Sequence, residues 1–251
     1  MTAATLLKLA LVPTAVWLAS LAARRWGHAV SGYLGGFPMI GGPITLYLAI
    51  DHGVEFAAAS ALVTLAAIAG QAAHLVSFAW AGIRFGWPAG LAAGWTGYAL
   101  VSVGASWIAS DPFMALALAI AGLLAAWVGL PRVRGPAALP AVPPVELWLR
   151  LAAAFALAAF ILWGSGTFGP VASGILLSMP ITGSIMPPFT LALYGREAIA
   201  RLLRGFVVGL CGFAAFFLTV AVAAVPLGIV AGFALATLAA LAAIFAITHL
   251  R

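Results

Sequence analysis

The sequence predicts an all-α integral membrane protein, a polytopic helix bundle of about nine transmembrane helices. Of its 251 residues, 65% are hydrophobic and only 6% are charged, whereas soluble domains carry roughly 25% charged residues. The apolar stretches are repeatedly long enough for the roughly 20 helical residues that cross about 30 Å of hydrocarbon. They lack the alternating pattern of barrel strands, so helices are the spanning element that remains.

Each apolar stretch marks one expected span. We expect spans near residues 4–22, 30–50, 57–80, 87–108, 112–130, 147–164, 168–194, 196–223 and 227–249. The prolines of residues 131–146 do not continue a helix and favour extended chain. We therefore predict a first membrane repeat of five spans at 1–130, a cytoplasmic linker at 131–146, and a second repeat of four spans at 147–251.

The basic residues lie almost entirely in the loops that follow odd-numbered spans or beside them. Ten of the eleven fall on that side: Arg24, Arg25, Arg84, Arg132, Arg134, Arg150, Arg196, Arg201, Arg204 and Arg251. The even-numbered loops hold Asp51, Glu55 and Asp111 and no Lys or Arg. Lys and Arg mark the cytoplasmic side, so we predict a bacterial inner-membrane protein with a periplasmic amino terminus and a cytoplasmic carboxy terminus.

Two spans are interrupted by glycine and proline, one in each half. The second span contains Pro38, Gly41, Gly42 and Pro43, followed by Thr45. The seventh contains Pro180, Thr182, Gly183, Ser184 and Pro187, followed by Thr190. Both follow the pattern Pro-x-x-Gly, a further proline, then an apolar residue, Thr and Leu.

The predicted topology makes these two stretches run in opposite directions, which predicts inverted repeats with broken second and seventh helices. Proline removes a backbone donor, and the groups that it frees in hydrocarbon need protein, water or ligand as partners. Opposed broken helices near the midplane form the binding site of many secondary transporters. The alternative is that paired kinks only shape the bundle, since Gly and Pro are common in transmembrane helices.

His74 is the ionisable side chain that lies well inside an apolar span, and Gln71 shares its helix face. An intramembrane ionisable group is a functional candidate, and histidine exchanges a proton near neutral pH. We therefore predict a proton relay at His74 and Gln71. The alternative is a neutral histidine hydrogen-bonded to a neighbouring helix, or to Ser77 one turn along.

Asp51, His52 and Glu55 form a cluster at the outer end of the second span. They are either metal ligands, a cation entrance or a solvated loop, and we favour the loop. Enzyme motifs such as His-Glu-x-x-His, a phosphate loop or paired carboxylates within a span are absent from the sequence. We predict no enzymatic activity, no cofactor and no metal site.

Residues Gly32-Tyr33-Leu34-Gly35-Gly36-Phe37-Pro38, which open the broken second span, resemble the GlpM-like group of small bacterial polytopic membrane proteins. The resemblance covers the second span and, more faintly, the seventh. This chain is roughly twice as long, so the resemblance implies a duplicated ancestor. It implies no substrate and no catalytic residue.

These observations favour a secondary transporter or permease for a neutral, amphipathic or mono-anionic small molecule. The expected partners are the lipid bilayer and that substrate, with a possible homo-oligomer. Nucleic acid is not an expected partner, because the positive charges are scattered in short loops. The alternative function is a non-transporting accessory or assembly protein that binds lipids or other membrane proteins.

Overall fold

The computed structural model describes residues 3–133, 145, 147–149, 151–152, 155–156 and 170–249. Every secondary-structure element of this described part is an α-helix, as the sequence predicts. Most of the predicted sixth span and most of the proline-rich connection lie outside the described residues.

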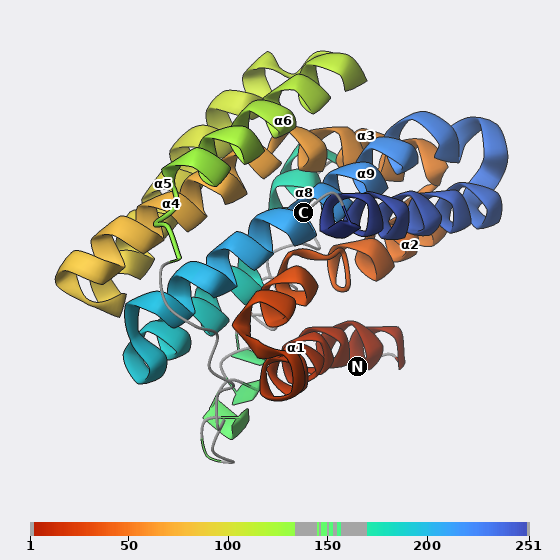
Figure 1. The fold of residues 1–251 in the computed structure, drawn as a ribbon. Coiled ribbons are helices and arrows are strands. Elements are labelled where there is room, and N and C mark those ends of the chain that lie inside the picture. The colour runs from red at the N-terminus through yellow and green to blue at the C-terminus, as the bar shows by residue number, and fades with distance from the viewer. Residues whose placement is uncertain are drawn as a thin grey trace.

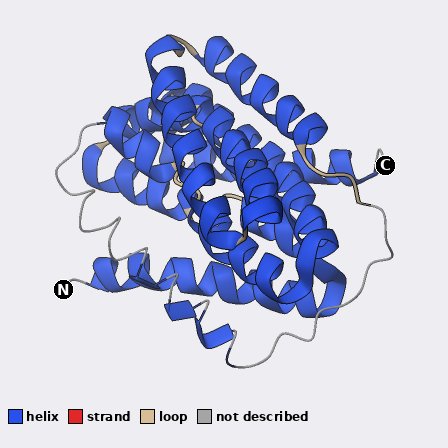
Figure 2. Cartoon of the chain, turned by 90° about the vertical axis from the view of Figure 1, so that its left-hand side faces the viewer, coloured by secondary structure: helices blue, strands red, loops and turns tan. Residues whose placement is uncertain are grey.

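The described helices pack side by side as one bundle (Figures 1 and 2). They are α1 (Ala3–Gly36), α2 (Gly41–His52), α3 (Val54–Ala66), α4 (Ile68–Phe85), α5 (Trp87–Ile108), α6 (Pro112–Gly129), α8 (Pro170–Leu177) and α9 (Ile181–His249). In Figure 1, α4, α5 and α6 lie on one side and α1 on the other. α9 passes between them and contacts α1, α3, α4 and α6.

Glycines with positive φ divide the two longest helices. α1 bends at Gly27 (φ 85), and α9 bends at Gly195 (φ 74) and Gly228 (φ 77). Only glycine adopts this backbone region without a steric cost. Each of these helices therefore contains more than one straight segment, and the segment that follows Gly195 begins where the predicted eighth span begins.

Among the described residues, four helical stretches are long and apolar enough to cross a membrane: Val16–His52, Val54–Phe85, Pro112–Gly129 and Val171–His249. Large apolar side chains are widely exposed on the outside of the bundle, among them Trp107 (85%) and Phe113 (84%). Such a surface is unfavourable in water and suits lipid. The architecture therefore fits a helical membrane protein, while the count of nine spans stays a prediction.

Small residues bring α1 and α9 into backbone contact. A Cβ atom added to Gly205 would lie 3.0 Å from the Cα of Gly32, and one added to Gly209 would lie 2.8 Å from the Cα of Gly36. Both helices present glycines four residues apart at this contact, which is a common way for membrane helices to approach closely.

One close contact occurs at two places whose residue numbers differ by 142. Gly32 of α1 packs against the carbonyl oxygen of Leu202 in α9, and Gly174 of α8 packs against the carbonyl oxygen of Ser60 in α3. Gly174 lies 142 positions after Gly32, and Leu202 lies 142 positions after Ser60. A helix of each half therefore packs on a helix of the other half in the same way.

Contacts between neighbouring helices recur with the same shift of 142 positions. Gly70 faces the carbonyl oxygen of Tyr98, at 2.9 Å from an added Cβ, and Gly212 faces that of Ala240, at 3.1 Å. Other positions matched by this shift are the contacts Gly82–Gly90 and Ala224–Gly232, and the positive-φ glycines Gly53 and Gly195, and Gly86 and Gly228. The same local contacts and turn glycines thus recur at several positions between residues 32–98 and 174–240.

Candidate functional site between two interrupted helices

The first interruption lies between the end of α1 at Gly36 and the start of α2 at Gly41. Here the Met39 amide donates to the Phe37 carbonyl (2.7 Å), and the Gly42 amide donates to the Pro38 carbonyl (2.9 Å). The Met39 bond spans only two residues and departs from the helical pattern, whereas the Gly42 bond is the regular four-residue bond with which α2 begins. The predicted Pro/Gly stretch therefore does break the helix.

The second interruption lies between the end of α8 at Leu177 and the start of α9 at Ile181. The Ile181 amide donates to the Met179 carbonyl (2.8 Å), and the Ser184 amide donates to the Pro180 carbonyl (2.7 Å). Both bonds match those of the first interruption after the shift of 142 positions. The interruption is shorter than the predicted Pro/Gly run, because Pro187 lies inside α9.

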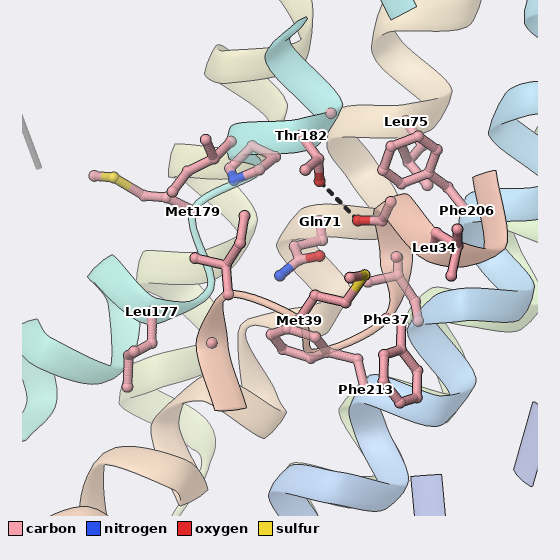
Figure 3. Close-up of a pocket in the computed structure, with 18 residues that line it drawn as sticks. Leu34, Phe37, Met39, Gln71, Leu75, Leu177, Met179, Thr182, Phe206 and Phe213 are labelled. Carbon is pink, nitrogen blue, oxygen red and sulfur yellow. Dashed lines mark hydrogen bonds between the residues drawn. The ribbon is translucent and has the colours of Figure 1, made fainter. Parts of the chain in front are cut away.

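A cavity of about 40 Å³ lies between the two interruptions (Figure 3). It is lined by residues of both interruptions and of α4 and α9: Leu34, Gly35, Gly36, Phe37, Met39, Ile40, Gly41, Gln71, Leu75, Leu177, Met179, Pro180, Ile181, Thr182, Gly183, Phe206, Leu210 and Phe213. Of the predicted binding residues, Gly41, Pro180, Thr182 and Gly183 line it. In this conformation its volume suffices for about one water molecule.

The carbonyl of Gly35 receives its hydrogen bond from the opposite half of the chain. In a regular helix it would accept from the amide of Met39, but that amide donates to Phe37 instead. The hydroxyl of Thr182 donates to Gly35 at 2.7 Å, as the dashed line in Figure 3 shows. Thr182 therefore satisfies a backbone acceptor that the first interruption frees, as membrane burial requires.

The carbonyl of Gly183 is freed in a similar way and is also reached from the other half. Its regular partner would be the amide of residue 187, but Pro187 has no amide hydrogen. Nε2 of His74 lies 3.3 Å from this carbonyl. Because the carbonyl only accepts, Nε2 carries the proton in this contact. The alternative prediction was a histidine hydrogen-bonded to a neighbouring helix. Nε2 makes such a bond.

The other ring nitrogen of His74 has a different setting. Nδ1 is buried, has no hydrogen-bond partner, and faces Gly94 of α5, whose added Cβ would lie 2.9 Å away. His74 is fully buried and sits behind Gly183 instead of lining the cavity, whereas Gln71 lines it directly. The bond to Gly183, and not one to Ser77, holds the ring.

The remaining predicted binding residues surround the cavity at a greater distance. Pro38, Gly42 and Pro43 line a separate apolar pocket of about 310 Å³ beside the first interruption. Thr45 donates to Gly41 in its own helix (2.7 Å), and Ser184 donates to Pro180, the residue before α9 (2.7 Å). Thr190 is fully buried, and its hydroxyl has no hydrogen-bond partner.

Asp51, His52 and Glu55 lie exposed around the turn between α2 and α3. Among the residues that the structure describes, no three His, Cys, Asp or Glu side chains are grouped closely enough to hold a metal ion. The metal-ligand interpretation of this cluster has no geometric support there.

Sequence reasoning missed the role of Tyr98 in α5. Its hydroxyl donates to the carbonyl of Ile175 (2.6 Å) and contacts the hydroxyl of Ser178 (2.8 Å). It therefore caps the end of α8 at the second interruption. In the sequence, only the combination of tyrosine and Ser102 within an apolar span hints at this role.

Comparison of the chain with protein-family models, with curated proteins and with solved structures gave no match.

Proposed function

We propose that this chain is a bacterial inner-membrane secondary transporter or permease for a neutral, amphipathic or mono-anionic small molecule. The observation that carries the proposal is that two helix interruptions with the same hydrogen-bond pattern meet at one cavity. Broken helices from two repeats, joined near the middle of the bilayer, are the usual substrate site of such transporters.

The constant shift of 142 positions supports two structural repeats. It relates the helix contacts, the turn glycines and the hydrogen bonds of the interruptions. In the proposed topology this shift carries span two onto span seven, which is five spans further. An odd number reverses direction across the membrane, so the repeats would be inverted.

Contacts among the basic loops support the proposed orientation. The Arg204 guanidinium donates to the carbonyls of Pro131 and Leu130, both at 3.0 Å. The Trp80 indole donates to the Gly129 carbonyl at 2.8 Å, one turn before Arg84. The loops after spans three, five and seven therefore meet at one end of the bundle, as the cytoplasmic assignment requires.

The cavity lining supports a substrate of low charge. Its side chains are apolar apart from Gln71 and Thr182, and no charged side chain lines it. The helices that start at Gly41 and Ile181 both begin at the cavity. Their amino-terminal ends carry partial positive charge and offer a place for a single carboxylate or similar group.

A cavity for one water holds no metabolite, so transport requires the repeats to move apart. We propose that the structure represents a closed state. Proton coupling would act through Nδ1 of His74, which is the unpartnered nitrogen. Protonation there places a charge next to Gly183 at the cavity wall, and a buried charge without a partner favours an opened, hydrated state.

The small volume also favours the second candidate function, a non-transporting accessory protein that binds lipids or other membrane proteins. In that case the hydrogen bonds between the interruptions would only hold the bundle together. The two functions differ in whether the cavity ever opens.

Flux measurements in proteoliposomes test the proposal. A panel of radiolabelled short monocarboxylates, neutral amino acids and sugars should include at least one solute whose uptake exceeds that of protein-free liposomes. An excess of the same solute without the label should reduce this uptake. If no solute passes this test, and the protein instead co-purifies with one fixed membrane partner, the accessory function is correct.

A further inference from the structure

A second, larger pocket opens at the basic end of the bundle, away from the central cavity. It measures about 660 Å³ and lies where the ends of α4 and α6 meet the segment of α9 that follows Gly195. Arg132 and Arg196 line it, together with Trp80, Val128 and Glu197. A pocket of this size takes a ligand as large as a lipid headgroup.

The wall of this pocket is fixed by side chains that bind three successive carbonyls at the end of α6. Trp80 holds Gly129, and Arg204 holds Leu130 and Pro131. The Arg204 guanidinium also lies 4.9 Å from the ring centroid of Trp127. These contacts position Arg132, the next residue of the chain, opposite α9.

The lining of the pocket is amphipathic. Arg132 and Arg196 are exposed cations that come from different elements. Glu197 contributes a carboxylate, which has an interaction partner of its own. Beside the cations, Val128 is 83% exposed and Trp80 is 56% exposed, so an apolar surface continues from the charged rim towards the lipid-facing side of the bundle.

We propose that this pocket binds an anionic phospholipid, with its phosphate at Arg132 and Arg196 and its acyl chains along Trp80 and Val128. Basic pockets between membrane helices are suited to acidic headgroups, and arginine pairs with phosphate through two donors at once. The exposed apolar wall is what distinguishes a lipid from a soluble anion here, because a free phosphate gains nothing from it. The site is independent of the proposed transport.

The test uses the full-length protein in a zwitterionic detergent. Short-chain phosphatidylglycerol is titrated, and binding is followed by tryptophan fluorescence and by native mass spectrometry. The variant Arg132→Gln/Arg196→Gln should raise the apparent Kd by roughly tenfold or more, since each cation contributes about 1 kcal/mol near an anionic headgroup. Arg25→Gln is the matched control, because Arg25 is exposed in α1 and does not line the pocket; its Kd should be unchanged.

If the double variant does not fold, the single variant Arg132→Gln tests the proposal. It should fold, because Arg132 is exposed and lies beyond the end of α6. It should weaken binding by roughly fivefold. Phosphatidylcholine should bind at least tenfold more weakly than phosphatidylglycerol. An unchanged Kd in the arginine variants overturns the proposal. So does displacement of the lipid by equimolar inorganic phosphate, which would indicate a site for a soluble anion.

Discussion

Thr182 donates a hydrogen bond of 2.7 Å to the carbonyl of Gly35 across 147 positions of the chain. The first helix interruption leaves that carbonyl without its regular amide partner, and the donor comes from the first turn after the second interruption. His74 and Gly183 repeat this relationship in the opposite sense, across 109 positions. Each half thus provides the side chain that satisfies a backbone acceptor freed in the other half.

Removal of the Thr182 hydroxyl should destabilise the protein, because it removes a hydrogen bond that links the two interruptions. In Thr182→Val the shape is nearly kept while the Gly35 carbonyl loses its donor, which costs about 1–3 kcal/mol for a buried group. Thermal unfolding in detergent measures the loss. Thr45→Val is the matched control, because the Thr45 hydroxyl bonds only to Gly41 of its own helix. Equal melting temperatures for the two variants would contradict the bridging role.

Close packing of α1 on α9 should be sensitive to a single methyl group. In Gly209→Ala the new Cβ would meet backbone atoms of Tyr33 and Gly36, which have little freedom to move. We expect a destabilisation of roughly 1–3 kcal/mol from overpacking. Gly104→Ala in α5 has no atom within 4 Å of the new Cβ and should be neutral or slightly stabilising. Denaturant titration of both variants gives the comparison, and a neutral Gly209→Ala would contradict this packing.

Two substitutions of His74 distinguish the roles of its two ring nitrogens. His74→Gln retains a donor for the Gly183 carbonyl and should fold normally, but it removes the ring nitrogen that can take up a second proton. His74→Leu removes the donor as well and should destabilise by roughly 1–3 kcal/mol. Once a transported solute is known, His74→Gln should lose its movement under a pH gradient. Full pH-driven transport by His74→Gln would return the histidine to a structural role.

Asp111 caps the amino terminus of α6, and its stabilising effect should depend on pH. Its Oδ1 accepts from the amides of Met114 (3.0 Å) and Phe113 (2.9 Å), which lower the pKa of this carboxyl, Met114 most. A lowered pKa in the folded state means that the stabilisation is present above the unfolded value of about 3.9 and is lost as the pH falls through the folded value.

Asp111→Ala should therefore melt below the wild type at pH 7, and the gap should shrink as the pH falls below about 4. Asp111→Asn, which keeps the capping oxygen, should melt closer to the wild type at pH 7. A gap between wild type and Asp111→Ala that is the same at both pH values would contradict this account.

Most helix boundaries of the described part follow from local sequence. α5 occupies the predicted 87–108, the bend at Gly195 falls between the predicted seventh and eighth spans, and the bend at Gly228 falls at the start of the predicted ninth span. These boundaries are predictable because glycine, proline and an Asp cap act within a few residues. The change of helix at Ala67, between α3 and α4, was not predicted, because neither a glycine nor a proline marks it.

The candidate site was predictable only in part. Proline and glycine located both interruptions, and Gln71, Thr182 and Gly183 do line the cavity between them. Sequence alone did not predict that Pro187 stays within α9, because the donor that replaces its missing amide is His74, on a distant helix. Hydrogen-bond partners on distant helices depend on how the two halves of the chain pack, and short sequence patterns do not predict that packing.

The central claim, that the cavity between the interruptions opens to both sides of the membrane, is tested most directly by cysteine accessibility. Cys211 is the only native cysteine, so Cys211→Ser gives a clean background. Met39→Cys and Met179→Cys then place one thiol in the cavity wall from each interruption. Gly104→Cys, which lies outside the cavity lining, is the control.

Each variant is treated with a membrane-impermeant methanethiosulfonate in right-side-out and in inside-out vesicles. The account predicts that both cavity thiols react from both sides, at rates that change in opposite directions when the pH is altered. Cavity thiols that react from neither side, or from one side only under every condition, would contradict alternating access and leave the accessory function.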